Sequence, residues 1–196
     1  MEAIATRRPL LRDNMDGGTH VEVFDCTVLP FSMAETGEAW WEVWHEFRGQ
    51  CGHDKTDDVV AESFGLEIRD VETGTSATFY VQQILHRYVN ENHVLYVWNM
   101  YTEPFLFKNS RVHGIYYREQ SYVLVKPVEM HEEATPCSQM VSSEDIKVEF
   151  LDPTTKKDAR IAALTKHMAK SMAPYIIMRN EAIETFLLDR ALQSRT

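Results

Sequence analysis

The apolar positions of this chain recur first at the spacing of strands and later at the spacing of a helix. In residues 20–29, valines alternate with polar side chains, which predicts a half-buried strand. Further apolar runs of this kind follow with short connections between them, which predicts an antiparallel meander. Two polar segments, 119–120 and 130–144, are expected to lie outside the strands as connections. We expect these strands at residues 62–69, 77–89, 94–101, 112–118, 122–125 and 146–151.

A first helix is predicted directly after the first strand. Ser32 and Glu35 form a capping box, in which a hydroxyl and a carboxylate each satisfy a backbone donor at the helix start. Trp40 and Trp44 fall on the apolar face of this helix, which points to the core.

A second, longer helix is predicted from residue 155 to about residue 192. Pro174 lies inside it and should kink it, because proline removes a backbone donor and clashes with the preceding turn. The apolar residues of this helix form a stripe at the 3.6-residue period, and Arg179 falls within that stripe if the period is unbroken. Alternatively, the kink rotates Arg179 out toward solvent. Residues 1–18 show no sustained period and are expected to form a flexible arm before a single domain, 19–196.

This order of elements predicts an α+β helix-grip fold, a curved antiparallel sheet of about seven strands wrapped around the C-terminal helix. A sheet that bends around one helix leaves a gap, which is a natural ligand site. Met168 and Met172 either line this cavity or fill the core. The expected cavity wall consists of Phe79, Val81, Gln83, Arg87, Trp98, Leu164, Met168 and Met172.

Two polar members of this wall, Gln83 and Arg87, stand among apolar residues of their strand. A polar group in an apolar wall needs a partner. They contact either the polar head of a ligand or, alternatively, a carboxylate at the strand end for Arg87 and solvent for Gln83.

Charge and cysteine usage narrow the classes of function. The formal net charge is -10, from 20 Lys and Arg against 30 Asp and Glu, which disfavours nucleic acid as a partner. Three widely spaced cysteines without a secretory segment predict free thiols in the cytoplasm: Cys26, Cys51 and Cys137. The long helix carries Lys166 and Lys170 on its polar face, so it either is simply solvated or makes transient contact with an anionic membrane.

Candidate catalytic and metal-binding residues are few. Cys51, His53 and Asp54 lie together in a polar loop, but zinc sites require paired ligands at short spacing, so no metal site is predicted. Isolated histidines such as His45 and His86 come without a nucleophile elbow, an H-E-x-x-H pair or a glycine-rich phosphate loop. We therefore expect a protein that binds no cofactor and is not an enzyme.

Three stretches resemble the START-like proteins of oomycetes, some of which are labelled mating-specific. They are residues 19–44 (THVEVFDCTVLPFSMAETGEAWWEVW), 64–98 (in particular QQILHRYVNENHVLYVW) and 117–127 (YREQSYVLVKP). The resemblance covers about two thirds of the chain and implies the helix-grip fold of lipid-transfer domains, which bind lipids or sterols beneath the C-terminal helix. The chain lacks the N-terminal helical region common in that family, and no catalytic residue is carried over.

The leading functional hypothesis is non-enzymatic binding of a small hydrophobic ligand, lipid or sterol-like, between the sheet and the C-terminal helix. A second hypothesis is a protein-interaction or regulatory domain whose cavity is filled by its own side chains. A third is an enzyme of the same fold that acts on an apolar substrate. A cavity of several hundred Å3 would favour the first, and convergent polar groups with perturbed pKa values the third.

Overall fold

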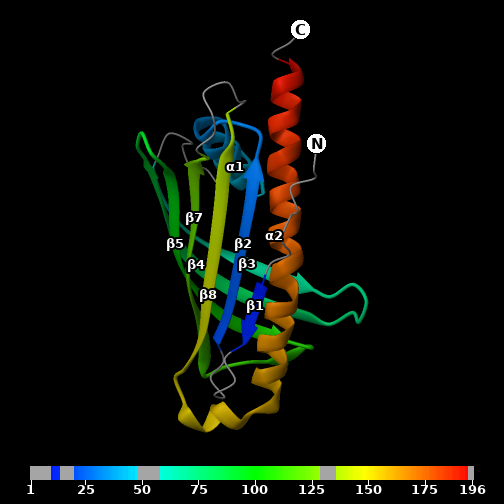
Figure 1. Cartoon of the computed structure of the whole chain (residues 1–196). Helices are drawn as coiled ribbons and strands as arrows, with labels where there is room; N and C mark the ends of the chain where they lie inside the picture. The colour runs from blue at the N-terminus through cyan, green and yellow to red at the C-terminus, as the bar shows by residue number, and fades with distance from the viewer. Residues whose placement is uncertain (1–9, 14–19, 48–57, 129–135, 194–196) are drawn as a thin grey trace.

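The structure is a computed structural model, which describes residues 10–13, 20–47, 58–128 and 136–193 (Figure 1). Its described part contains one sheet of eight strands and two α-helices. The elements are β1 (Leu10–Asp13), β2 (His20–Leu29), α1 (Met33–Phe47), β3 (Val59–Arg69), β4 (Ser76–Val89), β5 (Val94–Phe107), β6 (Ser110–Arg111), β7 (Ile115–Pro127), β8 (Ser138–Phe150), the 3-10 helix η1 (Pro153–Lys157) and α2 (Ala159–Gln193).

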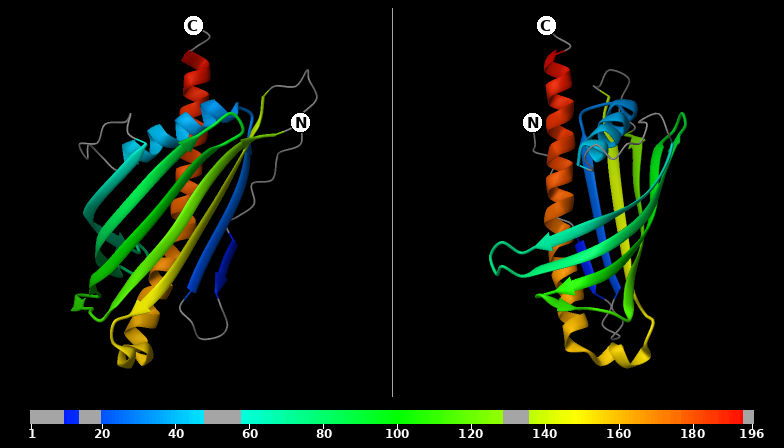
Figure 2. Two further views of the ribbon diagram at one scale, coloured as in Figure 1. Left: turned by 90° about the vertical axis from the view of Figure 1, so that its left-hand side faces the viewer. Right: turned by 180° about the vertical axis from the view of Figure 1, so that it is seen from behind.

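The strands pair in the order β1-β2-β8-β7-β5-β4-β3, and β6 pairs with β5. Every pairing is antiparallel. Short connections predict this for strands that are neighbours along the chain, whereas β2 and β8 pair although α1 and five strands separate them in the sequence. The sheet is curved, α1 crosses it at one end, and α2 runs along its inner face (Figure 2). The predicted α+β helix-grip fold is therefore confirmed.

The last two long strands differ from their prediction in the same way. β7 is one strand through Glu119 and Gln120, which were expected to form a turn, and β8 begins at Ser138 within the expected polar stretch. Along most of their length, every second residue is buried, and the residues between are exposed or partly buried in β7 and partly buried in β8. Several buried positions are polar, so the apolar pattern breaks although the strands do not.

Both ends of the chain also depart from expectation. Leu10–Asp13, inside the predicted arm, pairs with β2, whereas residues 1–9 and 14–19 lie outside the described residues. α2 spans 35 residues and continues through Pro174 without a break. It follows η1, whose N-cap Asp152 accepts a hydrogen bond from the backbone N–H of Thr154 at 2.9 Å.

The predicted capping box at the start of α1 is confirmed. The backbone N–H of Glu35 donates to Ser32 Oγ at 3.2 Å, and the N–H of Ser32 donates to Glu35 Oε2 at 2.9 Å. This cap fixes the helix register that buries Trp40 and Trp41, each 1% exposed, while Trp44 is half-buried. α1 thereby closes one end of the space between the sheet and α2.

Candidate functional site

The inner face of the sheet carries two separate apolar clusters, not one continuous core. The first, here the Phe79 cluster, packs against the N-terminal half of α2 and includes Val23, Phe79, Tyr117, Ile146, Leu164 and Ile176. The second, here the Trp40 cluster, lies under α1 and the C-terminal half of α2 and includes Trp40, Tyr96, Trp98, Val123 and Ile183. Met100 is half-buried and packs against both clusters.

Between the two clusters lies a row of buried polar side chains, here the polar band. Each member is at most 7% exposed, and the members come from three neighbouring strands and from α2. Inward positions recur every second residue of a strand, which is why these side chains share one face. The band consists of Asp25, Thr27, Glu119, Ser121, Ser142, Glu144, Arg179 and Asn180.

Strand register places the three carboxylates of the band side by side. Ser121 on β7 pairs with Glu144 on β8, so Glu119 is a diagonal neighbour of Glu144. Ser142 on β8 pairs with Asp25 on β2, so Asp25 is a diagonal neighbour of Glu144 on the other side. Diagonal neighbours on one sheet face lie about 7–8 Å apart, within electrostatic reach of each other in a buried setting.

Glu119 is held by two uncharged donors. Trp98 Nε1 donates to its Oε1 at 2.9 Å, and Ser121 Oγ donates to the same oxygen at 2.8 Å. Burial, and after it the neighbouring Glu144 charge, raise the pKa of Glu119 to about 7, against the lowering effects of its two donors and of Arg179. The Glu119 carboxyl group therefore changes between its protonated and ionised forms near neutral pH.

Glu144 faces the guanidinium of α2. Arg179 Nη1 donates to Glu144 Oε1 at 3.4 Å, and both side chains are 5% exposed. Burial raises the pKa of Glu144, and Arg179 opposes that shift. The sequence left open whether Arg179 is buried or rotated outward; in the structure it is buried, 4% exposed, on the helix turns that follow Pro174.

Asp25 completes the band from the far side. Asn180 Nδ2 donates to Asp25 Oδ2 at 2.7 Å, and Thr27 Oγ1 donates to the same oxygen at 3.2 Å. Two buried atoms of the band have no hydrogen-bond partner, namely Arg179 Nε and Asn180 Oδ1. Buried polar atoms are rarely left unpaired, so these two atoms mark a place where a donor and an acceptor are missing.

The residues predicted as a cavity wall are divided between the two clusters. Five of them belong to or pack against the Phe79 cluster, namely Phe79, Val81, Leu164, Met168 and Met172. Trp98 belongs to the Trp40 cluster and reaches into the polar band through its indole N–H. The predicted wall thus flanks the polar band on both sides.

The two polar residues of the predicted wall have partners within the protein. Gln83 Nε2 donates to Glu62 Oε1 at 2.5 Å, so its partner is a side chain and not solvent. Arg87 pairs with Glu38 at 2.5 Å and with Asp58 at 3.8 Å, the carboxylate contact that was one of the two interpretations. The Arg87–Glu38 pair joins the end of β4 to α1, and the Gln83–Glu62 contact joins β4 to β3.

Sequence reasoning missed the carboxylates of the band and Asn180. Glu119 was assigned to a turn and Glu144 to a polar stretch, because a charged residue was taken as a sign of exposure. The available signal was the period of two, which continues on both sides of Glu119 and Glu144. A carboxylate at an inward position of an alternating strand is the pattern that would have identified them.

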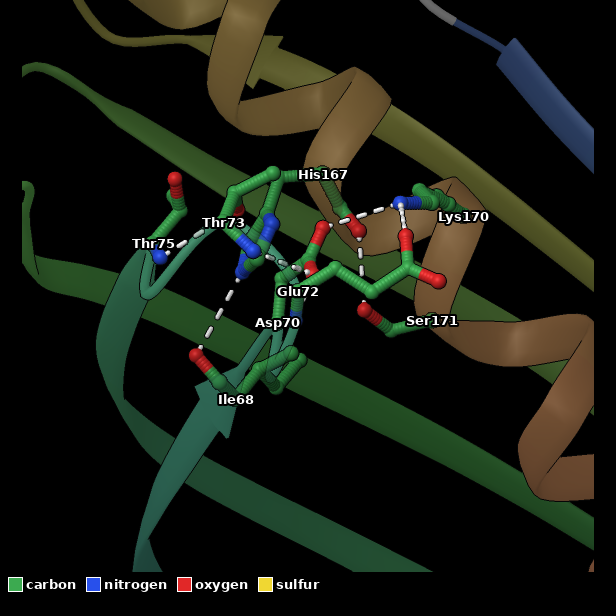
Figure 3. A network of polar contacts seen from close by, with 8 residues as sticks. All are labelled: Ile68, Asp70, Glu72, Thr73, Thr75, His167, Lys170 and Ser171. Carbon is green, nitrogen blue, oxygen red and sulfur yellow. Dashed lines mark hydrogen bonds and ion pairs between the residues drawn. The ribbon is translucent and has the colours of Figure 1, made fainter.

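A group of polar contacts at the edge of the molecule, here the clasp, joins the β3–β4 turn to α2 (Figure 3). Lys170 Nζ lies 2.9 Å from Asp70 Oδ2 and 3.7 Å from Glu72 Oε2. His167 Nε2 lies 3.3 Å from the backbone oxygen of Ile68. Hydrogen bonds from Lys170 and from backbone N–H groups lower the pKa of Asp70 to about 2, so the ion pair persists over the physiological pH range.

A cavity of about 50 Å3 lies apart from the polar band, lined by Arg111, Val112, His113, Thr155, Asp158, Arg160 and Ile161. Ligand pockets usually enclose about 300–1,000 Å3, so this cavity does not fit a lipid. Within the described ranges, no group of three or more His, Cys, Asp or Glu is arranged to hold a metal ion. The loop with Cys51 and His53 lies outside the described residues.

The fold and the polar band define a helix-grip protein with a buried, charged seam between sheet and helix. No protein-family model and no curated protein matches the chain. Among solved structures, an uncharacterised protein from Rhizobium leguminosarum is 16% identical, covers 87% of this chain and 95% of its own, and has a TM-score of 0.36. A conserved protein from Geobacillus kaustophilus is 9% identical, with coverages of 86% and 95% and a TM-score of 0.40. Likenesses this weak say nothing about function.

Proposed function

We propose that this chain is a START-like helix-grip protein that binds a small, largely apolar molecule between its sheet and α2. The observation that carries the proposal is the seam itself: two apolar clusters meet at a polar band in which Arg179 Nε and Asn180 Oδ1 have no partner. A molecule with an apolar body and one polar group matches such a surface, because it buries apolar area and supplies the missing hydrogen bonds.

Binding requires α2 to move away from the sheet. Pro174 lies in the middle of α2 and contributes no backbone N–H, which weakens the helix at that point. On one side of it the clasp holds α2 through Lys170 and His167, and on the other side Arg179 and Asn180 hold it. Opening at the clasp exposes the Phe79 cluster without breaking the buried ion pair.

Asp70→Asn tests the clasp as the point of opening. Without the Lys170–Asp70 pair, an apolar fluorescent probe should enter and leave at least threefold faster, with little change in Kd, because the pair lies outside the ligand seam. Stopped-flow fluorescence measures both rates. The matched control is Glu67→Gln, which removes an exposed pair with Arg69 on β3, and unchanged rates in Asp70→Asn would contradict this route.

Native mass spectrometry of the purified chain, followed by lipid extraction, tests the proposed function directly. We expect an adduct of a few hundred daltons that is lost on extraction and returns when the extract is added back. A chain that carries no adduct and binds no apolar probe would instead support the protein-interaction hypothesis, in which the interior is filled by its own side chains.

Met172→Trp tests where the ligand lies. Met172 is half-buried on α2 against the Phe79 cluster, so a larger ring there occupies the seam and should weaken probe binding at least tenfold. Met178→Trp is the matched control, since Met178 is 46% exposed on the same helix and should leave the Kd unchanged. Fluorescence titration gives both values, and equal affinities would place the site elsewhere.

A second candidate function is catalysis on an apolar substrate, favoured by the raised pKa values of Glu119 and Glu144 beside Arg179. A carboxyl that exchanges a proton near pH 7 is the kind of group that general acid–base catalysis uses. The molecule recovered from the chain distinguishes the two functions. Conversion of that molecule by the wild type but not by Glu119→Gln would establish an enzyme, and its recovery unchanged from both supports binding alone.

We also propose a cytoplasmic location, supported by Cys26, which forms no disulfide within the described part of the chain. In the described part of the chain, neither helix is apolar enough over a sufficient length to cross a membrane. Contact of α2 with an anionic membrane stays a prediction. Lys166 is exposed on α2, but Lys170 is already paired with Asp70, which reduces the charge that α2 offers.

A further inference from the structure

The charges of the polar band do not balance. Its described side chains include three carboxylates, Asp25, Glu119 and Glu144, against the single guanidinium of Arg179, and all four are at most 6% exposed. The contacts of Asp25 and Glu119 are hydrogen bonds from uncharged donors, Asn180, Thr27, Trp98 and Ser121. Such donors reduce the cost of burying a carboxylate but leave its charge in place.

A buried excess of negative charge can be neutralised by a proton or by a cation. Isolated buried carboxylates are costly enough that they usually take up a proton. The whole chain also carries a net charge of -10, so cations are attracted to it more strongly than anions. A ligand that brings a positive charge would therefore gain more from this seam than a neutral ligand of the same shape.

We infer that the ligand is an amphiphilic amine, and that its ammonium group lies against Glu119 and Glu144 while its apolar chain lies between α2 and the apolar clusters. This inference rests on the proposed function and names the ligand class. An ammonium group has three donors and no acceptor, so it suits carboxylate oxygens and the unpartnered Asn180 Oδ1, whereas Arg179 Nε stays without an acceptor.

Other head groups fit the band less well. A carboxylate would add a fourth negative charge beside Glu119 and Glu144, which disfavours it. A hydroxyl could pair with Arg179 Nε and Asn180 Oδ1 but would leave the excess charge unchanged. Arg179 repels an ammonium, but its own charge is directed at Glu144 through Nη1, and two further carboxylates remain.

Amine binding then competes with a proton at Glu119. The charged groups that act on Glu119 are Glu144 from β8 and Arg179 from α2, while Trp98 from β5 and Ser121 from β7 are uncharged. When the ammonium binds to the protonated state, the Glu119 carboxyl releases its proton to the buffer and keeps the negative charge that pairs with the ligand. Amine affinity should therefore fall as pH drops below 7.

Isothermal titration of the full chain with decylamine, decanol and decanoate tests the head group at pH 7.5, below the micelle concentration of each. We expect decylamine to bind at least tenfold more tightly than decanol, and decanoate to bind more weakly than either. Glu119→Gln should remove the preference for the amine and keep decanol binding. Glu91→Gln, which removes an exposed carboxylate at the β4–β5 turn, should keep the preference.

Proton release provides a second measurement that needs no variant. At pH 6.5, decylamine binding to the wild type should show different apparent enthalpies in two buffers of different ionisation enthalpy, corresponding to release of a fraction of one proton. Equal binding of decanol and decylamine, or no proton release, would overturn the amine assignment and leave the proposed function standing. Binding of neither compound would count against the proposed function itself.

Discussion

Arg179→Met is expected to lower the free energy of unfolding by about 3–5 kcal/mol at pH 7.5. Arg179 is the single positive charge in the band of described residues, and its Nη1 lies 3.4 Å from Glu144 Oε1. Methionine keeps the apolar stem but leaves Glu144 buried without a counter-charge, beside Glu119 and Asp25. Urea unfolding monitored by circular dichroism measures the loss.

The same deficit should shrink as the pH is lowered to 5. Without Arg179, Glu119 and Glu144 hold their protons still more strongly, and protonation removes the repulsion between them. Arg118→Met is the matched control, because Arg118 lies on the outer face of β7 and pairs with Glu149 at 3.2 Å while half-exposed. It should cost at most about 1 kcal/mol. A loss of that size in Arg179→Met as well would show that the buried pair does not hold α2 to the sheet.

The wild-type protein should become less stable as the pH rises from 5 to 8. The pKa of Glu119 is raised from 4.5 to about 7 in the folded state, so the folded chain binds more protons than the unfolded chain within this window. Its contribution to stability is complete below pH 4.5 and is lost as the pH rises through 7, an effect on the order of 2–3 kcal/mol.

Glu119→Gln should flatten this pH dependence. A glutamine oxygen still accepts from Trp98 and Ser121, so the variant keeps its contacts and loses only the titration. Glu91→Gln, exposed at a turn, should retain the wild-type profile. Urea unfolding at half-unit pH steps compares the three proteins, and parallel profiles for the wild type and Glu119→Gln would mean that Glu119 stays ionised when buried.

The sequence determined those features that depend on neighbours along the chain. The capping box of Ser32 and Glu35, the period of two in the strands and the apolar stripe of α2 are local patterns, and they gave both helices and most strands, although not the full extent of β7 and β8. The antiparallel meander from β3 to β8 followed from its short connections, whereas the pairing of β2 with β8 did not. Together these patterns were sufficient for the helix-grip fold.

Only the tertiary structure decided what lies at the centre of the grip. Glu119, Glu144 and Arg179 are far apart in the sequence, and each belongs to a residue type that is usually exposed. They meet because β7 and β8 pair in one register and α2 crosses them there. Charge is a property of a residue, whereas burial and the partner that offsets it are properties of the packed molecule. The sequence therefore predicted a ligand cavity between sheet and helix, and the packing placed a buried, charged band there.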